Sequence, residues 1–220
     1  MATISAGEGR YRTSKCALVT VGASASFKPL IEEVLSDAFI TKLKSLHFTH
    51  FIVQCGPDYD YFESAKPKRN PDDPNDLEVV GFPYKNAFRA WFALATESRP
   101  DEPYPRAKGL IITHAGSGSI LDALDFNTNI IAVPNPALMG NHQSEIAEEM
   151  ERQGFLIQGK LGSLVDLLDE ETLNTPRKQW PPEPDPDSMF PGGLWQVIDM
   201  LMPKRRLGDE PQGRPRWLLL

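Results

Sequence analysis

The residues best suited to chemistry stand between Lys108 and Asn127, in the stretch KGLIITHAGSGSILDALDFN. A short apolar run over 109–113 ends in His-Ala-Gly-Ser-Gly-Ser, and a segment with apolar residues at helical spacing follows it. This pattern predicts a buried strand, a glycine-rich turn and a helix that starts at Gly116 or Ser117. A ligand can approach the backbone closely at such a turn, because glycine has no side chain to block it.

The start of this helix has the chemistry of an anion site. The first helical turn leaves backbone N–H groups without intrahelical partners and carries the positive end of the helix dipole. Gly116 and Gly118 leave room for a phosphate, and the hydroxyls of Ser117 and Ser119 can donate hydrogen bonds to it. Asp122 follows Ser119 on the same side of the helix, where its carboxylate can accept hydrogen bonds from a sugar. The stretch predicts a nucleotide site, and a turn that serves packing alone is the alternative.

Two common nucleotide-binding motifs do not match this stretch. The dinucleotide fingerprint requires a third glycine where Leu121 stands, and no acidic residue closes a clear second strand at the usual distance downstream. The P-loop requires a Lys-Ser or Lys-Thr pair after the glycines, and none is present. A dinucleotide oxidoreductase is therefore a poor match, and a P-loop nucleotide hydrolase is excluded.

A second polar group, formed by Asn141, His142 and Gln143, begins another predicted helix, which ends near Gly154. This helix follows a predicted strand over 129–133. In an open α/β sheet the carboxyl ends of the parallel strands share one edge, and ligands bind at that edge. We therefore expect the second group to lie near the glycine-rich turn. The alternative is a capping asparagine beside two solvated side chains.

Apolar segments with the periods of strands and helices alternate along the chain, which predicts an α/β fold with a doubly wound, Rossmann-like parallel sheet. The strands are expected at 15–22, 48–54, 77–82, 109–113, 129–133 and 155–158, and the helices at 27–46, 84–95, 117–127, 141–154 and 161–168. The proline-rich stretch over 57–76 is expected to be a long insertion loop, and 98–107 a second loop.

The composition is that of a globular chain. Its 220 residues, 40% of them hydrophobic, suffice for one sizeable core with extensions. The net charge of −7 argues against a general nucleic-acid-binding surface. We expect a cytosolic chain, because no apolar run approaches the length of about 20 residues that spans a bilayer and the N-terminus lacks a signal-peptide pattern. Cys16 and Cys55 are expected to be buried free thiols, and no Asp-x-Asp pair is convincingly placed to bind a metal.

The last part of the chain differs from the rest. We expect a folded domain over 15–170 and a proline-rich tail over 176–220. Within the tail, apolar residues at helical spacing from Leu194 to Met202 predict a helix with one apolar face. The hydrophobic end from Trp217 to Leu220 adds further apolar surface, so we expect the tail to fold back on the domain or to dock on a partner.

Three motifs resemble one enzyme family. They are VTVGAS, followed by Phe27 and Leu30, THAGSGSILDAL at 113–124 and NHQSEIAEEM at 141–150. They resemble the carboxyl-terminal domain of glycosyltransferase family 28, which includes the bacterial peptidoglycan N-acetylglucosaminyltransferases and the small catalytic subunits of the endoplasmic-reticulum UDP-N-acetylglucosamine transferase. The resemblance covers about residues 15–170 and implies the donor-binding half of a GT-B fold.

By this resemblance, the UDP-N-acetylglucosamine donor would contact residues of both motif helices and one strand end. Ser117, Gly118 and Ser119, beside Gly116, would hold the diphosphate, and Asp122 would hold the ribose. His142 and Gln143, next to Asn141, would contact the N-acetylglucosamine, and the backbone near Gly81 and Phe82 would hold the uracil. No metal and no cofactor are implied.

The implied reaction is the second step of lipid-linked oligosaccharide synthesis for N-glycosylation. It transfers N-acetylglucosamine from the UDP-sugar to N-acetylglucosaminyl-diphospho-dolichol with inversion. A membrane-anchored partner subunit would supply the other half of the GT-B fold and hold this chain at the cytoplasmic face of the endoplasmic reticulum, with a further pool in the cytosol. His114 is the candidate base in this chain. A buried histidine that orients the glycine turn, or a base on the partner, remains open, as does a non-catalytic nucleotide-sugar-binding regulatory subunit.

Overall fold

The described part of the chain forms one α/β unit. The computed structural model describes residues 13–23, 25–73, 76–84, 88–99, 101–102, 104–138 and 142–182. By its internal contacts the chain divides into a unit over Met1–Trp180 and a second over Pro181–Leu220. All helices and strands described below belong to the first unit. The expected tail helix over 194–202 lies outside the described residues, so the proposed division into a domain and a docking tail stays a prediction.

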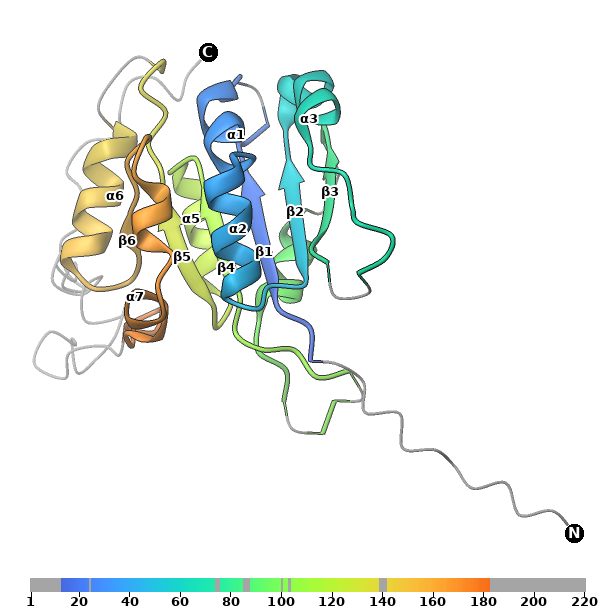
Figure 1. The fold of residues 1–220 in the computed structure, drawn as a ribbon. Helices are drawn as coiled ribbons and strands as arrows, with labels where there is room; N and C mark the ends of the chain where they lie inside the picture. Colours follow the sequence, from blue (N-terminus) through green and yellow to red (C-terminus); the bar gives the residue numbers. More distant parts are fainter. Residues whose placement is uncertain are drawn as a thin grey trace, which may run out of the picture. The chain divides into compact units, whose positions relative to one another are not determined.

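A six-stranded parallel sheet forms the centre of this unit (Figure 1). Its strands are β1 (Cys16–Thr20), β2 (His50–Gln54), β3 (Glu78–Phe82), β4 (Leu110–Thr113), β5 (Asn129–Ala132) and β6 (Ile157–Gln158). The order in space is β3-β2-β1-β4-β5-β6, and every pairing is parallel. The chain thus moves outward from β1 to β3 and then returns to the other side of β1 with β4. The predicted doubly wound sheet is confirmed, and its order reverses between β1 and β4.

Helices cover both faces of the sheet, because alternate side chains of each strand point to opposite faces. One face packs against α1 (Lys28–Val34), α2 (Asp37–Ser45), α3 (Tyr59–Ala65), the 3-10 turn η3 (Leu164–Leu167) and α7 (Glu170–Asn174). The other face packs against α4 (Arg89–Phe92), the 3-10 turn η2 (Ala93–Ala95), α5 (Ser117–Leu124) and α6 (His142–Arg152). The central strands are buried on both faces, as parallel sheets are.

The helix expected over 27–46 is two helices, so that prediction was wrong. α1 ends at Val34, and Ser36 adopts an extended backbone as the N-cap of α2. Its hydroxyl oxygen accepts a hydrogen bond from the backbone N–H of Phe39 at 3.3 Å. Serine followed by Asp37 is a helix-start signal, and it outweighs the continuous apolar pattern.

In the stretch over 57–76, the loop that its prolines predict is confirmed only after α3 (Tyr59–Ala65), over the described residues 66–73. The stretch opens with a 3-10 turn, η1 (Gly56–Asp58), and continues into α3. Phe62 of α3 is fully buried, and a Cβ added at Gly81 of β3 would lie 2.3 Å from its ring. The missing side chain at Gly81 therefore lets α3 pack directly on the edge strand.

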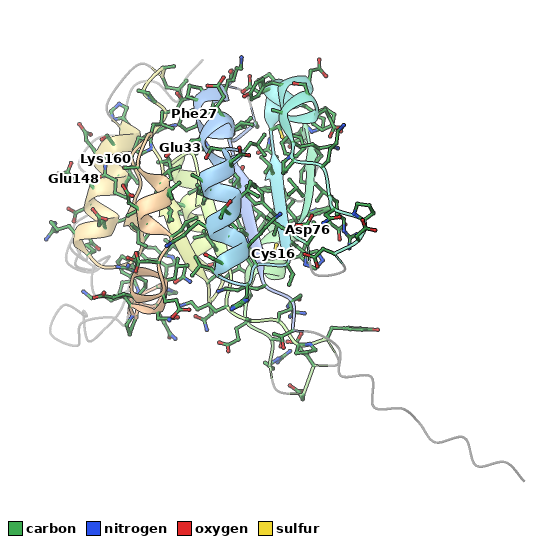
Figure 2. The ribbon with its side chains drawn as sticks, viewed as in Figure 1. Cys16, Phe27, Glu33, Asp76, Glu148 and Lys160 are labelled. Atoms are coloured by element: carbon green, nitrogen blue, oxygen red, sulfur yellow. The ribbon has the colours of Figure 1, made fainter. Side chains whose placement is uncertain are left out.

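Three shorter elements also differ from the sequence prediction. The helix expected over 84–95 is described only from Arg89, as the short α4 and η2. The helix expected over 161–168 is the 3-10 turn η3, and α7 was not predicted. The η3 turn is fixed to α1 by Glu33, whose carboxylate accepts hydrogen bonds from the backbone N–H groups of Gly162 at 2.7 Å and Leu164 at 2.8 Å (Figure 2).

Cys16 and Cys55 are buried and free, as expected. Burial raises the pKa of each thiol to about 12, so both stay protonated at neutral pH. No helix in the described ranges is long and apolar enough to cross a membrane.

Asp76 anchors the turn that leads into β3 (Figure 2). Its carboxylate accepts hydrogen bonds from the backbone N–H of Asn70 at 2.7 Å and of Leu77 at 2.9 Å, and it pairs with the Lys44 ammonium at 2.6 Å. The Asn70 N–H, followed by Lys44, holds the pKa of Asp76 below its ordinary value. The turn therefore depends on the ionised carboxylate.

Replacing Asp76 with asparagine should lower the free energy of unfolding by about 2 kcal/mol at pH 7, because one amide cannot replace a carboxylate that accepts three hydrogen bonds. The pKa of Asp76 is lower in the folded protein. Its contribution is therefore present above the unfolded pKa of about 3.9 and is lost as the pH falls through the folded value. Urea unfolding should show a smaller difference in the free energy of unfolding between wild type and Asp76→Asn near pH 3 than at neutral pH. The exposed control variant Asp72→Asn should match the stability of wild type at both pH values. A loss of stability in Asp76→Asn that is the same at both pH values would contradict the role of the ionised carboxylate.

Candidate functional site

The loops after β1 and β4 meet at the point where the strand order reverses. The ladder of these two strands continues past their ends, because the backbone N–H of His114 donates to the carbonyl of Thr20 at 3.1 Å. Ligands of open α/β sheets bind in the crevice at such a reversal. The glycine-rich turn predicted from the sequence therefore lies where the fold favours binding.

The His114 ring separates the two loops. A Cβ added at Gly22 would lie 2.6 Å from the ring, and one at Gly116 would lie 2.4 Å from it. Gly22 also has a φ of +84°, a conformation that favours glycine. The two glycines are therefore required because the imidazole occupies the space that their side chains would need.

His114 is held in its neutral form by burial. Burial lowers its pKa below the ordinary value, and the Thr20 carbonyl opposes this shift. Its Nδ1 is buried and has no hydrogen-bond partner among the described atoms. A neutral imidazole can accept a proton, but this ring lies between two backbone loops. The assignment of His114 as the base stays a prediction beside its evident role as a spacer.

The N-terminus of α5 has no side-chain cap among the described residues. Gly116 is the N-cap, with an extended backbone and no side-chain cap, and Ala115 before it has a φ of +61°. Ser117 and Gly118 are exposed, and a Cβ added at Gly118 would meet no atom within 4 Å. Among the described residues, no side chain caps the first-turn N–H groups, and open space lies beside Gly118; anion binding at this helix end stays a prediction.

Beside this helix end lies a cavity of about 320 Å³. Its lining combines the predicted polar residues of α5 with strand ends and an aromatic wall: Thr20, Gly22, Ala23, Gln54, Tyr84, Phe88, Arg89, Phe92, Ser119 and Asp122. Ser119 and Asp122 therefore face one cavity, which is the arrangement expected for a phosphate and an adjoining sugar.

Asp122 has a cationic neighbour that the sequence did not reveal. Its side chain is 50% exposed, and its carboxylate lies 3.4 Å from Nε of Arg89. The same guanidinium pairs with Asp125. Arg89 comes from α4, 33 positions before Asp122 in the chain. Because nothing in the local sequence links the two segments, only the fold brings this guanidinium to the cavity.

Phe82 lies behind the aromatic residues that line the cavity. Its ring lies 5.0 Å from that of Trp91 and 5.7 Å from that of Phe88, centroid to centroid. Phe82 is buried and does not line the cavity, whereas Tyr84 and Phe88 do. The Phe82 carbonyl accepts a hydrogen bond from the backbone N–H of Cys55 at 2.9 Å. A base-binding role for the backbone near Phe82 stays a prediction.

Gln54 joins three strand ends under the cavity. Its Oε1 accepts a hydrogen bond from the Thr20 hydroxyl at 2.7 Å, and its Nε2 donates to the carbonyls of Gly22 at 2.9 Å and Pro83 at 2.8 Å. It is buried at the end of β2, directly after three apolar residues. A lone polar residue at that position was the available sequence signal, and the sequence analysis missed it.

The second predicted polar group is only partly described, because Asn141 lies outside the described residues. His142 begins α6 with a side chain that is 89% exposed, and its ring lies 3.7 Å from the carboxylate of Glu145. Gln143 is tied to the sheet edge, since its Oε1 accepts a hydrogen bond from the backbone N–H of Asn135 at 2.9 Å. No described residue bonds to the Nε2 group of Gln143.

Asn135 links this group to the loop after β1. It is 6% exposed, and its Nδ2 donates to the carbonyl of Ser26 at 3.0 Å while its Oδ1 accepts from the N–H of Ala137 at 3.0 Å. On the other side, the Ser26 hydroxyl donates to Asp58 at 2.8 Å. The loops after β1, β2 and β5 form one hydrogen-bonded network, which the sequence analysis did not identify.

Replacing Asn135 with alanine should lower the free energy of unfolding by about 1–3 kcal/mol, because it removes both side-chain hydrogen bonds of a buried residue. Asn135→Asp should lose at least as much stability, because it buries a carboxylate against the Ser26 carbonyl without a donor between them. Urea unfolding measures both effects. Wild-type stability in Asn135→Ala would refute the link between the two loops.

Residues 16–179 match the glycosyltransferase family 28 C-terminal domain. The chain belongs to this family. It is 34% identical over 145 residues to the UDP-N-acetylglucosamine transferase subunit ALG13 of Yarrowia lipolytica, which covers 66% of this chain and 65% of that protein. It is 28% identical over 186 residues to the subunit of the same name in Candida albicans, covering 76% and 63%. This chain thus spans less than two thirds of the length of these two relatives.

A solved structure supports the family fold. The NMR solution structure of ALG13 superposes with a TM-score of 0.52 at 26% sequence identity, over 80% of this chain and 93% of that one. Family 28 membership agrees with the site at the strand-order reversal. Within the described ranges, no group of three or more His, Cys, Asp or Glu side chains is placed to hold a metal ion.

Proposed function

We propose that this chain is the donor-binding catalytic subunit of an N-acetylglucosaminyltransferase. It binds UDP-N-acetylglucosamine in the cavity beside α5, as the donor half of a GT-B enzyme, and a partner subunit supplies the other half. The observation that carries the proposal is the uncapped N-terminus of α5, which opens beside a cavity lined by Ser119 and Asp122. Membership of family 28 and the names of the relatives support the choice of donor.

The helix end serves the step in which the sugar leaves UDP. Breaking the glycosidic bond places negative charge on the diphosphate, and a fixed dipole with aligned N–H groups stabilises charge that develops in the transition state. The hydroxyl of Ser119 adds a donor beside it. Asp122 holds the ribose, and the Nε2 of Gln143 donates to the sugar. The diphosphate is thereby held without a protein-bound metal.

The acceptor in this proposal is N-acetylglucosaminyl-diphospho-dolichol, and the partner is anchored in the endoplasmic-reticulum membrane. The chain then works at the cytoplasmic face of that membrane. Among the described residues that line its cavity, Asp122 has the one carboxylate, and this group is paired with Arg89. The acceptor's proton is therefore taken by His114 or by a residue of the partner.

The same shortage of an evident base favours a second candidate, a nucleotide-sugar-binding regulatory subunit without catalytic residues. Transfer of labelled N-acetylglucosamine to a short-chain acceptor lipid distinguishes the two. We expect transfer when this chain and its membrane-anchored partner are combined, and none with either alone. Equal transfer by the partner alone would show that this chain is regulatory. Absence of UDP-N-acetylglucosamine binding by this chain would refute both.

A further inference from the structure

The amide of Gln54 lies between two loops that border the donor cavity. Its strand, β2, has β1 on one side and β3 on the other. Nε2 donates to the carbonyl of Gly22, in the loop after β1, at 2.9 Å, and to the carbonyl of Pro83, in the loop after β3, at 2.8 Å. One side chain therefore joins the carboxyl ends of three neighbouring strands.

This amide is held in one orientation by Thr20. Its Oε1 accepts a hydrogen bond from the Thr20 hydroxyl at 2.7 Å, and that hydroxyl oxygen accepts one from the backbone N–H of Gly22 at 3.2 Å. Gln54 and Thr20 are each 2% exposed, so little water competes with these bonds. Because the N–H and the carbonyl of Gly22 both bond to this pair of side chains, the pair fixes the position of the loop after β1.

The position of Gly22 matters for the start of α5. A Cβ added at Gly22 would lie 2.6 Å from the His114 ring, and one at Gly116, the N-cap of α5, would lie 2.4 Å from the same ring. The imidazole thus fills the space between the loop after β1 and the helix end that is proposed to hold the diphosphate. Because closely packed groups transmit displacements to their neighbours, a shift of this loop should also shift the ring and the helix end.

On its other side, Gln54 fixes the loop that begins with Pro83. The Pro83 carbonyl also accepts a hydrogen bond from the backbone N–H of Gly56 at 2.8 Å, and the next residue, Tyr84, lines the donor cavity. Gln54 lines the cavity as well. A ligand that reaches from the α5 end of the cavity to the Tyr84 end must therefore match a distance that this amide sets.

We propose that Gln54 is a positioning residue that sets the span of the donor cavity between its diphosphate end and its base end. This inference rests on the proposed function, with the diphosphate at α5 and the uracil near the end of β3. A ligand held at two points loses affinity when the points no longer match its length, whereas a ligand held at one point does not. Gln54 therefore acts on the binding of UDP as a whole and not on that of its separate parts.

The test compares UDP with its two parts, uridine and inorganic pyrophosphate, on the full chain labelled with ¹⁵N. Shifts of the amide resonances of Gly118 and Tyr84 report on the two ends of the cavity. Gln54→Met keeps the length of the side chain but has no N–H groups to donate to the two carbonyls. We expect this variant to bind UDP about tenfold or more weakly, and to bind uridine and pyrophosphate within about twofold of wild type.

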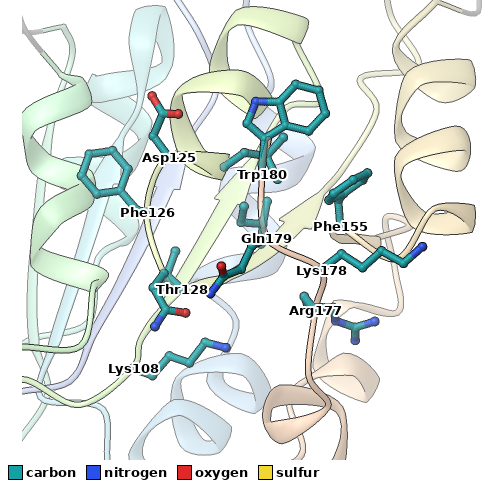
Figure 3. Close-up of a pocket in the computed structure, with 12 residues that line it drawn as sticks. Lys108, Asp125, Phe126, Thr128, Phe155, Arg177, Lys178, Gln179 and Trp180 are labelled. Atoms are coloured by element: carbon teal, nitrogen blue, oxygen red, sulfur yellow. The ribbon is translucent and has the colours of Figure 1, made fainter. Parts of the chain in front are cut away.

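Two control variants separate this effect from a loss of stability and from the substitution itself. Asp76→Asn is expected to destabilise the fold but lies outside the donor cavity lining. Gln179→Met makes the same change in the wall of a second cavity, of about 240 Å³, which shares no lining residue with the donor cavity (Figure 3). Lys108 and Thr128 of that wall lie just before β4 and β5, at the amino ends of the strands. Both controls should bind UDP as wild type does.

A second lining variant keeps the proposal testable if Gln54→Met does not fold. Thr20→Val has nearly the shape of threonine without the hydroxyl, so it removes the partner of Oε1 and leaves both Nε2 bonds in place. It should weaken UDP binding about threefold or more and again spare uridine and pyrophosphate.

The outcomes distinguish this proposal from the function on which it rests. UDP binding by wild type that is unchanged in both lining variants would overturn the role of Gln54 alone. Equal losses for UDP, uridine and pyrophosphate, or a loss confined to one of the two parts, would also overturn it, because the amide would then support a wall rather than a span. Absence of UDP binding by wild type would refute the proposed function and this inference with it.

Discussion

Gly116→Ala should abolish measurable UDP-N-acetylglucosamine binding and lower the free energy of unfolding by about 1–3 kcal/mol, the usual cost of forcing extra atoms into a packed site. The new Cβ would lie 2.4 Å from Nε2 of His114, so either the ring or the turn before α5 must move. The backbone of Gly116 has a φ of −67°, which alanine adopts without strain. The whole effect should therefore come from the contact with His114. Calorimetric titration with the UDP-sugar and urea unfolding measure the two losses.

The same helix supplies a matched control. Gly118→Ala changes a glycine two positions later, where a Cβ meets no atom within 4 Å. This variant should keep its fold and gain up to about 1 kcal/mol of stability, because alanine is the better helix former. Because the proposed diphosphate lies beside Gly118, this variant is the control for stability and not for donor binding.

A double variant identifies the cause of the Gly116→Ala defect. Combining it with His114→Ala removes the ring that the new methyl group meets. The loss of unfolding free energy in the double variant should therefore be smaller than the sum of the two single losses. Additive losses would show that His114 is not the obstacle. Transfer by His114→Ala with the partner subunit also tests whether this imidazole is needed as a base.

The strands, the doubly wound sheet and the glycine-rich turn could be predicted because each depends on a local pattern. Continuous apolar runs mark strands that are buried on both faces, and the glycine-rich turn lies after β4 at the centre of the sheet. The single helix expected over 27–46 failed because the apolar pattern continues across Ser36, whereas the cap at Ser36 breaks the helix. Proline-rich composition likewise concealed α3, which packs on the core through the buried Phe62 and the partly buried Tyr59, Tyr61 and Ala65.

The parts of the site that could not be predicted are contacts between distant segments. Arg89 reaches Asp122 from another helix, and Asn135 reaches Ser26 across 109 positions of the chain. Such pairs leave no spacing to recognise in one sequence. They also change the chemistry inferred from α5 alone, because Asp122 is not a free carboxylate but one that shares a guanidinium with Asp125.

Asp122→Ala should weaken UDP-N-acetylglucosamine binding by about tenfold to a hundredfold, since each hydrogen bond to a charged group contributes about 1.5–3 kcal/mol. The side chain is half-exposed in the free protein, so its removal should have little effect on stability. Asp122→Asn keeps one acceptor oxygen and should lose less affinity. Binding of UDP-N-acetylglucosamine and of a UDP analogue without the ribose hydroxyls locates the contact: only the natural donor should respond to the change.

Asp125→Ala distinguishes a direct contact from an effect through Arg89. Both aspartates pair with this guanidinium, but only Asp122 lines the donor cavity. If Asp122 holds the ribose, Asp125→Ala should leave donor affinity within about twofold of wild type, as expected for an exposed ion pair. Equal losses in the two variants would mean that the released Arg89, rather than a missing ribose contact, weakens binding. Unchanged affinity in Asp122→Ala would remove Asp122 from the site and leave the α5 N-terminus as the only donor contact on this helix.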